Sequence, residues 1–260
     1  MFIGVEKIKL KSKLEIKKMR VAGKVTGKLL EELNNIIKPG ITTEHINSFT
    51  EQYIRSFKMI PAFLGVKGIS INFPASACVS VNDEVVHGIP NKSRMLRSGD
   101  IVSVDVGTIY NGYYSDAAKT YAVGDVSKIA NKLINITKLS LELGIKQVIP
   151  GNKIGDISFV IQRLVEDNGF TIVKDFVGHG IGKSLHENPQ IPNFGKKNTG
   201  LKLIPGMVFT IEPMVNVGNY EVYINPKNNW TVLTKDKSLS AHFEHTIAVT
   251  EDGCEILTNI

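Results

Sequence analysis

The spacing of hydrophobic and polar residues divides the chain into helical stretches and shorter stretches with the features of strands. A capping box, Ser12 to Glu15, opens the first helix, and Pro39-Gly40 ends it. The other predicted helices run from residue 42 or 43 to about 57, over 127–148, and over 154–168. Strand-like runs lie at 77–82, 101–109, 113–121, 171–174, 207–212, 230–234, 243–249 and 254–258.

The order of the predicted elements, two helices followed by strands, occurs twice along the chain. This predicts an α+β fold with two similar halves built around one sheet. No linker rich in Pro, Gly or Ser separates the halves. We therefore expect residues 1–260 to form a single domain, with residues 1–11 as a short N-terminal segment.

Two of the strand-like runs flank an Asn-Gly pair at 111–112, the strongest short signal for a type I′ hairpin. A two-residue turn there places Gly107 opposite Asp116, and Asp105 shares a face with Gly107 because side chains alternate. The two aspartates become diagonal neighbours, roughly 7–8 Å apart at the backbone. They are either exposed carboxylates near a sheet edge or a pair that holds a cation between them.

Five of the six histidines lie outside the predicted amphipathic helices; they are His87, His179, His186, His242 and His245. His179 lies between glycines in the segment 177–182, and those glycines allow close approach of the backbone. Taken alone, each of these histidines is equally compatible with a structural role.

Two acidic residues lie in otherwise apolar runs. Glu212 closes the run 207–211, and Glu244 lies inside the strand-like segment 241–249. An isolated buried carboxylate is costly, whereas a metal-bound one is not. Four carboxylates and one imidazole suit two divalent ions such as manganese, iron or cobalt, while a structural zinc prefers Cys and His.

The stretch GHGIGKS, from Gly178, superficially matches a phosphate-binding loop. Three residues separate Gly178 from Gly182, whereas the Walker motif requires four before its Gly-Lys-Ser. The spacing therefore argues against nucleotide binding.

In order and local context, the five candidate ligands are similar to those of the methionine aminopeptidases; they are Asp105, Asp116, His179, Glu212 and Glu244. The matching blocks are VVHGIP (85–90), the two aspartates (105–116), GHGIG and HENP (178–189), PGMVFTIEP (205–213) and the segment 230–246. The resemblance implies the family's pita-bread fold, with two helix-helix-strand halves around a curved, mainly antiparallel sheet. His179 and Glu212 are only 33 positions apart, so the chain resembles the short bacterial type I enzymes, which lack the helical insertion of type II and a zinc-finger extension.

The resemblance implies a methionyl aminopeptidase, a hydrolase that removes the initiator methionine from nascent proteins when the second residue is small. Asp116 and Glu244 would bridge two divalent ions, Asp105 would complete the coordination of one, and His179 and Glu212 that of the other. Cobalt, manganese, iron or zinc all fit such a site.

The resemblance also implies the catalytic roles. A hydroxide bridging the two ions would attack the scissile carbonyl, and Glu212 would shuttle its proton. His87 and His186 would hydrogen-bond the peptide and stabilise the tetrahedral intermediate.

By the same resemblance, a methionine pocket would be lined by Phe63, Val66, Phe73, Cys78, Leu185 and Trp230. Val66 stands where the family commonly has an aromatic residue, and Leu185 where it usually has Phe. About four extra residues near 69–72 lengthen the preceding loop. His242 stands where Gln is common and is expected to support the metal site from outside.

The positive charge of the chain is concentrated at its N-terminus. The net charge is +6, but residues 1–28 alone carry +7. This segment is either an ordinary solvated helix face or a docking surface for a polyanion such as ribosomal RNA. The second interpretation predicts transient ribosome contact, alongside the N-termini of nascent polypeptides as substrate.

The composition of the chain indicates the cellular compartment in which the protein is expected to work. The two cysteines, Cys78 and Cys254, argue against a disulfide framework. The chain has neither an apolar signal-peptide core nor an apolar run long enough to cross a membrane. We expect a cytoplasmic monomer that does not bind membranes.

Two rival functions remain. An aminopeptidase P or prolidase shares the five ligands but usually carries an extra N-terminal domain that has no counterpart in this sequence. A pita-bread protein that has lost catalysis and binds RNA or protein would fit the basic N-terminus. Retention of all five ligand positions, with His87 and His186, argues against it.

Overall fold

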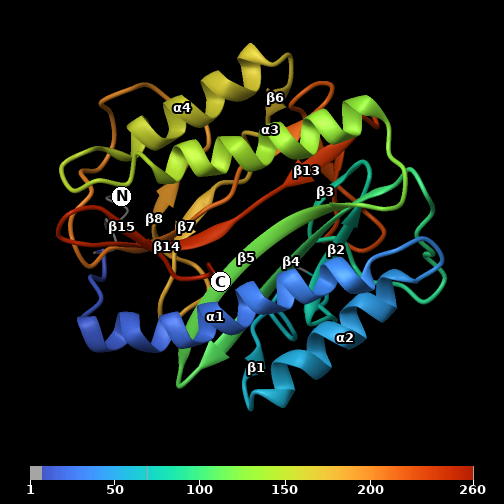
Figure 1. Ribbon diagram of the computed structural model, residues 1–260, viewed down its shortest axis with the longest axis horizontal. Helices are drawn as coiled ribbons and strands as arrows, with labels where there is room; N and C mark the ends of the chain where they lie inside the picture. The colour runs from blue at the N-terminus through green and yellow to red at the C-terminus, as the bar shows by residue number, and fades with distance from the viewer. Residues whose placement is uncertain (1–7, 69, 260) are drawn as a thin grey trace.

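The computed structural model describes residues 8–68 and 70–259. Four helices pack in two pairs in front of the strands (Figure 1). The first pair is α1 (Lys13–Ile36) and α2 (Thr43–Ser56), and the second is α3 (Lys128–Ile145) and α4 (Ile154–Asp167). Two helices thus precede each group of strands, as the sequence predicts.

The helix ends follow the predicted capping chemistry. Ser12 and Glu15 form a reciprocal capping box at the start of α1, and the side chains of Thr42 and Ser127 accept N-terminal hydrogen bonds in α2 and α3. Helix α1 ends three residues before Pro39, because proline cannot continue a helix.

The first half contains the strands β1 (Ile60–Pro61), β2 (Ala77–Val81), β3 (Glu84–Val86), β4 (Ile101–Tyr110) and β5 (Tyr113–Ala122). The second half contains β6 (Thr171–Ile172), β7 (Gly178–Gly180), β8 (Glu187–Ile191), β9 (Val208–Ile211), β10 (Met214–Asn216), β11 (Val222–Ile224), β12 (Val232–Thr234), β13 (Ser240–His242), β14 (His245–Val249) and β15 (Cys254–Ile256).

The pairings between these strands are antiparallel, and they form four ladders rather than one continuous sheet. The ladders are β1-β4-β2 with β5 on β4, β13-β10-β6, β11-β12-β3, and β15-β14-β9-β7-β8. A backbone bridge between Ala118 and Glu244 connects the β5 ladder to the edge of β14, so the two halves meet there.

The β4–β5 hairpin has the predicted register. Gly107 lies opposite Asp116, and both turn residues, Asn111 and Gly112, have positive φ as a type I′ turn requires. Several short strands, including β3, β7, β8 and β13, were not predicted, because runs of three to five residues are too short to show a clear alternation of side chains.

Each helix pair covers one apolar cluster on one face of its strands. The opposite face of those strands is not covered by the helix pair. Val104 and Val106 of β4 pack in the cluster beneath α1 and α2. Ala241 and Phe243 pack in the cluster beneath α3 and α4. Because strand side chains alternate, the residues between these positions point away from the helices, and it is there that the acidic residues gather.

The segment before α1 is held by a buried ion pair. Lys11 is 8% exposed, its Nζ lies 2.7 Å from the Glu187 carboxylate, and its backbone N–H donates to the Gly206 carbonyl. Lys11 therefore contributes neither to a solvated face nor to a docking surface, the two interpretations that the sequence leaves open for residues 1–28. Arg20 is also paired, with Glu255. Among the described residues, no helix combines the length and apolarity that a membrane crossing would require.

Candidate metal centre

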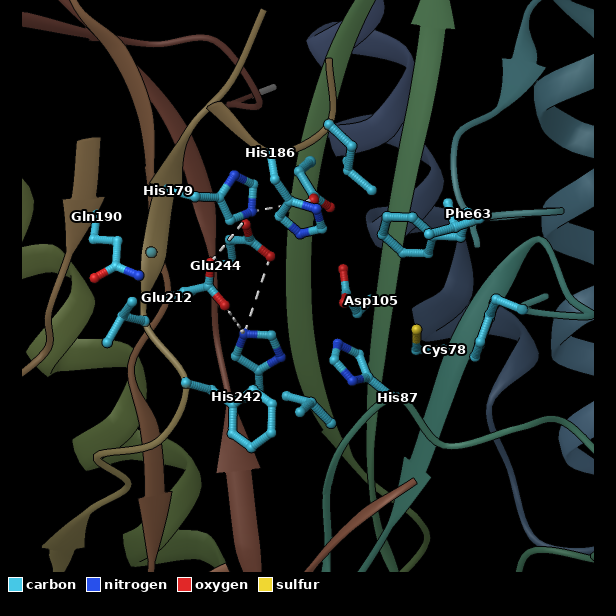
Figure 2. Close-up of a pocket in the computed structure, with 18 of the residues that line it drawn as sticks. Phe63, Cys78, His87, Asp105, His179, His186, Gln190, Glu212, His242 and Glu244 are labelled. Atoms are coloured by element: carbon cyan, nitrogen blue, oxygen red, sulfur yellow. Dashed lines mark ion pairs between the residues drawn. The ribbon is translucent and has the colours of Figure 1, made fainter. Parts of the chain in front are cut away.

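One cavity of about 410 Å³ collects every site residue predicted from the sequence. The predicted residues in its wall are Phe63, Val66, Phe73, Cys78, His87, Asp105, Asp116, His179, Leu185, His186, Glu212, Trp230 and Glu244. They come from both halves of the chain. In Figure 2 the labelled residues Cys78, His87 and Asp105 of the first half face His179, Glu212 and Glu244 of the second. Their individual roles stay predictions.

The β4–β5 hairpin places the two aspartates in the wall of the cavity. Asp105 on β4 and Asp116 on β5 both face the cavity, as the register predicts. The position of Asp116 is fixed by β14, because its backbone N–H donates to Thr246 Oγ1 at 3.0 Å and its carbonyl accepts from the same hydroxyl at 2.7 Å. Gly107 leaves room for the cavity wall, since a Cβ there would lie 2.8 Å from the Ala62 side chain.

His179 lies on β7 between two glycines that cannot be replaced without strain. A Cβ at Gly178 would lie 2.4 Å from the Thr210 carbonyl oxygen, and one at Gly180 would lie 2.2 Å from the Asn188 carbonyl oxygen. The predicted close approach of the backbone is confirmed. The His179 Nδ1–H donates to the Gly180 carbonyl at 3.0 Å, which leaves the Nε2 lone pair directed at the carboxylates.

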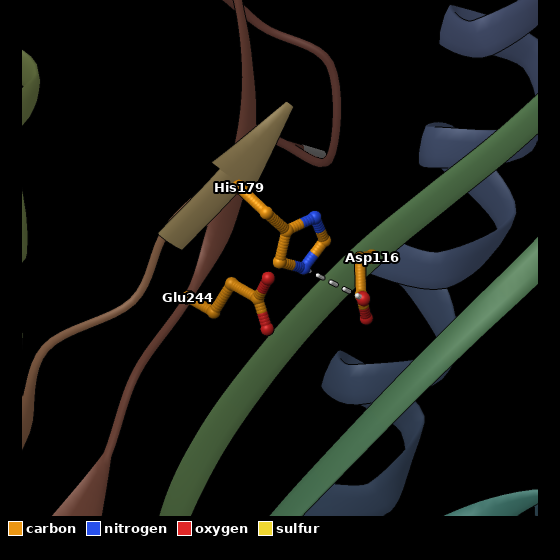
Figure 3. Close-up of side chains that lie close together, drawn as sticks. All are labelled: Asp116, His179 and Glu244. Carbon is orange, nitrogen blue, oxygen red and sulfur yellow. Dashed lines mark ion pairs between the residues drawn. The ribbon is translucent and has the colours of Figure 1, made fainter. Parts of the chain in front are cut away.

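The Nε2 atom of His179 lies among carboxylates without forming a hydrogen bond to any. It is 3.9 Å from Asp116 Oδ2 and 3.6 Å from Glu212 Oε1. Figure 3 shows His179 with Asp116 and Glu244, three groups whose ligand atoms lie within 4.8 Å of one another. Burial lowers the pKa of His179 to about 3, so the imidazole is neutral at pH 7 and these contacts are not charge pairs.

Glu212 follows β9 and is oriented by a threonine. Thr210 Oγ1 donates to Glu212 Oε1 at 2.8 Å and accepts from the His179 backbone N–H at 3.1 Å. The Glu212 carbonyl accepts from Asn193 Nδ2. One hydroxyl thereby couples the position of the Glu212 carboxylate to the backbone of His179.

The four carboxyl groups share a buried space, and burial is the largest cause that raises the pKa of each. Burial raises the pKa of Asp105 to about 7 and that of Glu212 to about 8. Burial and the neighbouring acids raise the pKa values of Asp116 and Glu244 well above the ordinary range. Four acids with no described cationic side chain among them are unfavourable as anions unless a cation is present.

The buried carboxylate oxygens of this cluster are suited to binding a metal ion. Asp105 Oδ1, Asp116 Oδ1 and Glu244 Oε1 are buried and have no hydrogen-bond partner among residues 8–68 and 70–259. Metal–ligand bonds of about 2.0–2.2 Å allow two ligand atoms to lie up to roughly 4.4 Å apart. The separations of 3.6 and 3.9 Å around His179 lie within that limit.

Beside the acids, the cavity has an apolar wall. Phe63, Phe73 and Cys78 pack with Val66 and Trp230 in one cluster. The rings of Phe73 and Trp230 meet edge to face at 5.2 Å. Burial raises the pKa of the Cys78 thiol well above its usual range, so it remains a neutral apolar contact.

The loop lengthened near 69–72 borders this wall. Trp230 Nε1 donates to the Ile71 carbonyl at 3.0 Å, and a Cβ on Gly68 would lie 2.5 Å from the Trp230 ring. Residue 69, which belongs to the predicted insertion, lies outside the described residues. The described part of the loop therefore braces Trp230.

The two histidines predicted to contact the peptide line the same cavity as the acidic cluster. The His186 ring lies 4.4 Å from that of His179, and the His87 ring meets Phe176 and Trp230 edge to face. Burial lowers the pKa of His87 to about 4 and lowers that of His186. Both are neutral at pH 7 and able to donate one hydrogen bond from the ring.

The Lys11–Glu187 pair fixes the loop that carries His186. Glu187 accepts hydrogen bonds from the backbone N–H groups of Lys183 and Ser184, and its other oxygen binds Lys11. Glu187 also lines the cavity, as do Phe176 and Gln190, and none of the three was predicted as a site residue. Glu187 lies within the HENP block, which is the one signal that pointed to it.

Comparison with known proteins places these features in a family. The model of metallopeptidase family M24 matches residues 17–251. A methionine aminopeptidase of Clostridium acetobutylicum is 49% identical over 249 residues, covering 96% of this chain and 98% of that protein. The crystal structure of methionine aminopeptidase from Rickettsia prowazekii superposes with a TM-score of 0.93 at 45% identity, covering 97% of this chain and 100% of that one.

A more distant structure shares the fold alone. The Xaa-Pro dipeptidase of Bacillus anthracis has a TM-score of 0.75 at 23% identity, and the match covers 96% of this chain but 62% of that one. The α+β pita-bread architecture is therefore confirmed.

Proposed function

The chain belongs to metallopeptidase family M24, and we propose that it is a metal-dependent aminopeptidase that removes the N-terminal methionine of nascent proteins. High identity to methionine aminopeptidases over nearly the whole chain supports this function. The observation that carries it most directly is the cluster of buried, unpaired carboxylate oxygens facing a neutral imidazole in a cavity with an apolar wall.

Divalent ions are expected in this cluster, two per chain, held by Asp105, Asp116, His179, Glu212 and Glu244. Cobalt, manganese, iron and zinc each suit this donor set. When bound, such ions polarise a peptide carbonyl and lower the pKa of water near neutrality. The four carboxylates offset four positive charges, so the loaded site is close to neutral.

The chain's own residues supply the proton transfer. The Glu212 carboxylate faces the centre of the cluster, and its orientation is set by Thr210. We assign it the role of accepting the proton of the attacking water and passing it toward the leaving amine. His87 and His186 are the candidates for donating hydrogen bonds to the peptide and to the developing oxyanion.

The apolar wall is the candidate methionine pocket. A thioether side chain fits a narrow cavity with polarisable walls, and Phe63, Phe73, Cys78 and Trp230 provide aromatic and sulfur contacts. A small second residue is expected, because the side chain beside the scissile bond must fit between His186 and the acidic cluster.

The basic N-terminus supports a weaker, second proposal. Lys13, Lys17, Lys24 and Lys28 are exposed on α1 and are spaced by four, seven and four residues, so they lie along one side of the helix. We call these four residues the basic stripe. It suits transient contact with ribosomal RNA in the cytoplasm, where nascent N-termini emerge, and its binding would be strongly salt-dependent. Replacing all four lysines with Gln should weaken ribosome co-sedimentation at low salt and leave tripeptide cleavage unchanged.

The decisive experiment measures substrate choice. With manganese or cobalt added, the enzyme should release methionine from Met-Ala-Ser and leave Met-Phe-Ser and Ala-Pro-Ser intact. Efficient cleavage of the X-Pro peptide would redirect the assignment to a prolidase-like function, and no cleavage with normal metal content would favour a binding protein.

A further inference from the structure

His242, which the sequence predicts to support the metal site from outside, is a buried residue whose imidazole faces two of the predicted metal ligands. The residue is 1% exposed, and within the part of the chain that the structure describes its Nε2 atom has no hydrogen-bond partner. Nε2 lies 3.9 Å from Glu212 Oε2 and 4.0 Å from Glu244 Oε2. Both distances exceed the roughly 3.2 Å limit of a good N–H···O hydrogen bond, so the nitrogen is directed at carboxylates that it does not bind.

The direction of this side chain is set by its strand. His242 and Glu244 are two residues apart and both face the cavity, whereas Phe243 faces the core beneath α3 and α4. Thr120 Oγ1 accepts from the His242 backbone N–H at 2.9 Å and donates to its carbonyl at 2.8 Å. The imidazole is therefore held in the cavity by backbone contacts that do not involve its ring.

The three groups form a ligand set of their own. One ligand atom each from Glu212, His242 and Glu244 lies within 4.8 Å of the others, the same condition met by the group around His179. Figure 2 shows His242 and His179 on opposite sides of the two glutamates. A cation between these atoms would satisfy the His242 Nε2 atom, which has no hydrogen-bond partner among the described residues.

We propose that His242 is a sixth metal ligand, whose Nε2 binds a cation held by Glu212 and Glu244 on the side opposite His179. The proposal rests on the proposed dinuclear function. A second imidazole makes the centre richer in nitrogen, which favours iron, cobalt and zinc over manganese and magnesium. His242 would thus help to determine which metal the enzyme takes.

Proton NMR of the cobalt(II)-loaded protein tests this by counting coordinated imidazoles. Each coordinated ring retains one exchangeable N–H whose resonance is strongly shifted by the paramagnetic ion and disappears in D₂O. The wild type should show two such signals, and His242→Gln and His179→Ala should each lose one. His242→Gln should also bind cobalt at least about tenfold more weakly than the wild type does. Even the loss of a residue that only hydrogen-bonds a metal ligand typically weakens metal affinity by about tenfold or more, so the loss of a ligand should weaken it at least as much. Its affinity for manganese should fall less.

His245→Gln is the matched control. His245 lies three residues away, and its Nδ1 bonds to Thr258 at 2.8 Å beside a separate cavity. This variant should keep both signals and the cobalt affinity. One shifted signal in the wild type, or two in His242→Gln, would overturn the proposal while leaving the dinuclear function intact. A wild type that binds no cobalt would overturn the proposed function itself.

Discussion

Replacing Lys11 with Met should destabilise the protein and slow catalysis without emptying the metal centre. Lys11 and Glu187 are each 6% exposed at the side chain and 2.7 Å apart. Removing one partner of a buried pair leaves an uncompensated charge, which costs roughly 3–5 kcal/mol. Glu187 keeps two backbone N–H donors in the variant, so we expect about 3 kcal/mol, at the lower end of that range.

The loss should depend on pH. Burial raises the pKa of Glu187, but the hydrogen bond and charge of Lys11, with the backbone donors, outweigh burial and lower it overall. A carboxyl with a lowered folded-state pKa stabilises the protein above its unfolded pKa and loses this contribution as pH falls. The difference between wild type and Lys11→Met should therefore be full at pH 7 and shrink below about pH 4.3.

Urea unfolding of the metal-free proteins at several pH values measures the free-energy difference, and methionine release by the loaded proteins measures the effect on the loop that carries His186. Lys9→Met is the control, because it removes the same charge from an exposed position two residues away. The double variant Lys11→Met with Glu187→Gln should recover part of the lost stability. Equal stability of Lys11→Met and Lys9→Met at pH 7 would refute the reasoning.

The remaining predictions concern the site. Asp116→Asn should reduce kcat by more than tenfold, a barrier increase above about 1.4 kcal/mol, while circular dichroism shows an intact fold. His179→Ala should hold one ion fewer than the wild type on elemental analysis, whereas His87→Ala should keep both ions and lose about 10²–10³-fold in rate. Because the pKa values of Asp105 and Glu212 are raised to about 7 and 8 in the metal-free site, metal binding at pH 6.5 should release protons, and affinity should fall as pH drops through this range. Calorimetry in buffers of different ionisation enthalpy would detect this release, and an uptake of protons would contradict it.

Short-range sequence patterns were sufficient to predict the helices and the β4–β5 hairpin that carries Asp105 and Asp116. The capping box at Ser12 and the Asn-Gly turn at 111–112 act over a few residues, and the turn fixes the register that places Asp105 and Asp116 on one face. The pairing of the hairpin with β14, which brings Glu244 to Asp116, is a contact between distant segments and followed only from the resemblance.

Other features depend on tertiary contacts that no local pattern encodes. Strands β7 and β8 contain glycine and proline at positions where backbones approach closely, so their sequences lack strand periodicity. The burial of Lys11 was missed because a lysine in a basic segment is ordinarily solvated. The orientation of His242 toward Glu212 required the contacts of Thr120 with its backbone.

The proposed function requires the carboxylate cluster to hold metal ions while the N-terminal methionine is cleaved. Its most direct test is methionine release from Met-Ala-Ser by protein stripped of metal and then titrated with cobalt(II). We expect no release from the stripped protein and a rate that rises with added ion and levels off at two ions per chain. An undiminished rate in the stripped protein would contradict it.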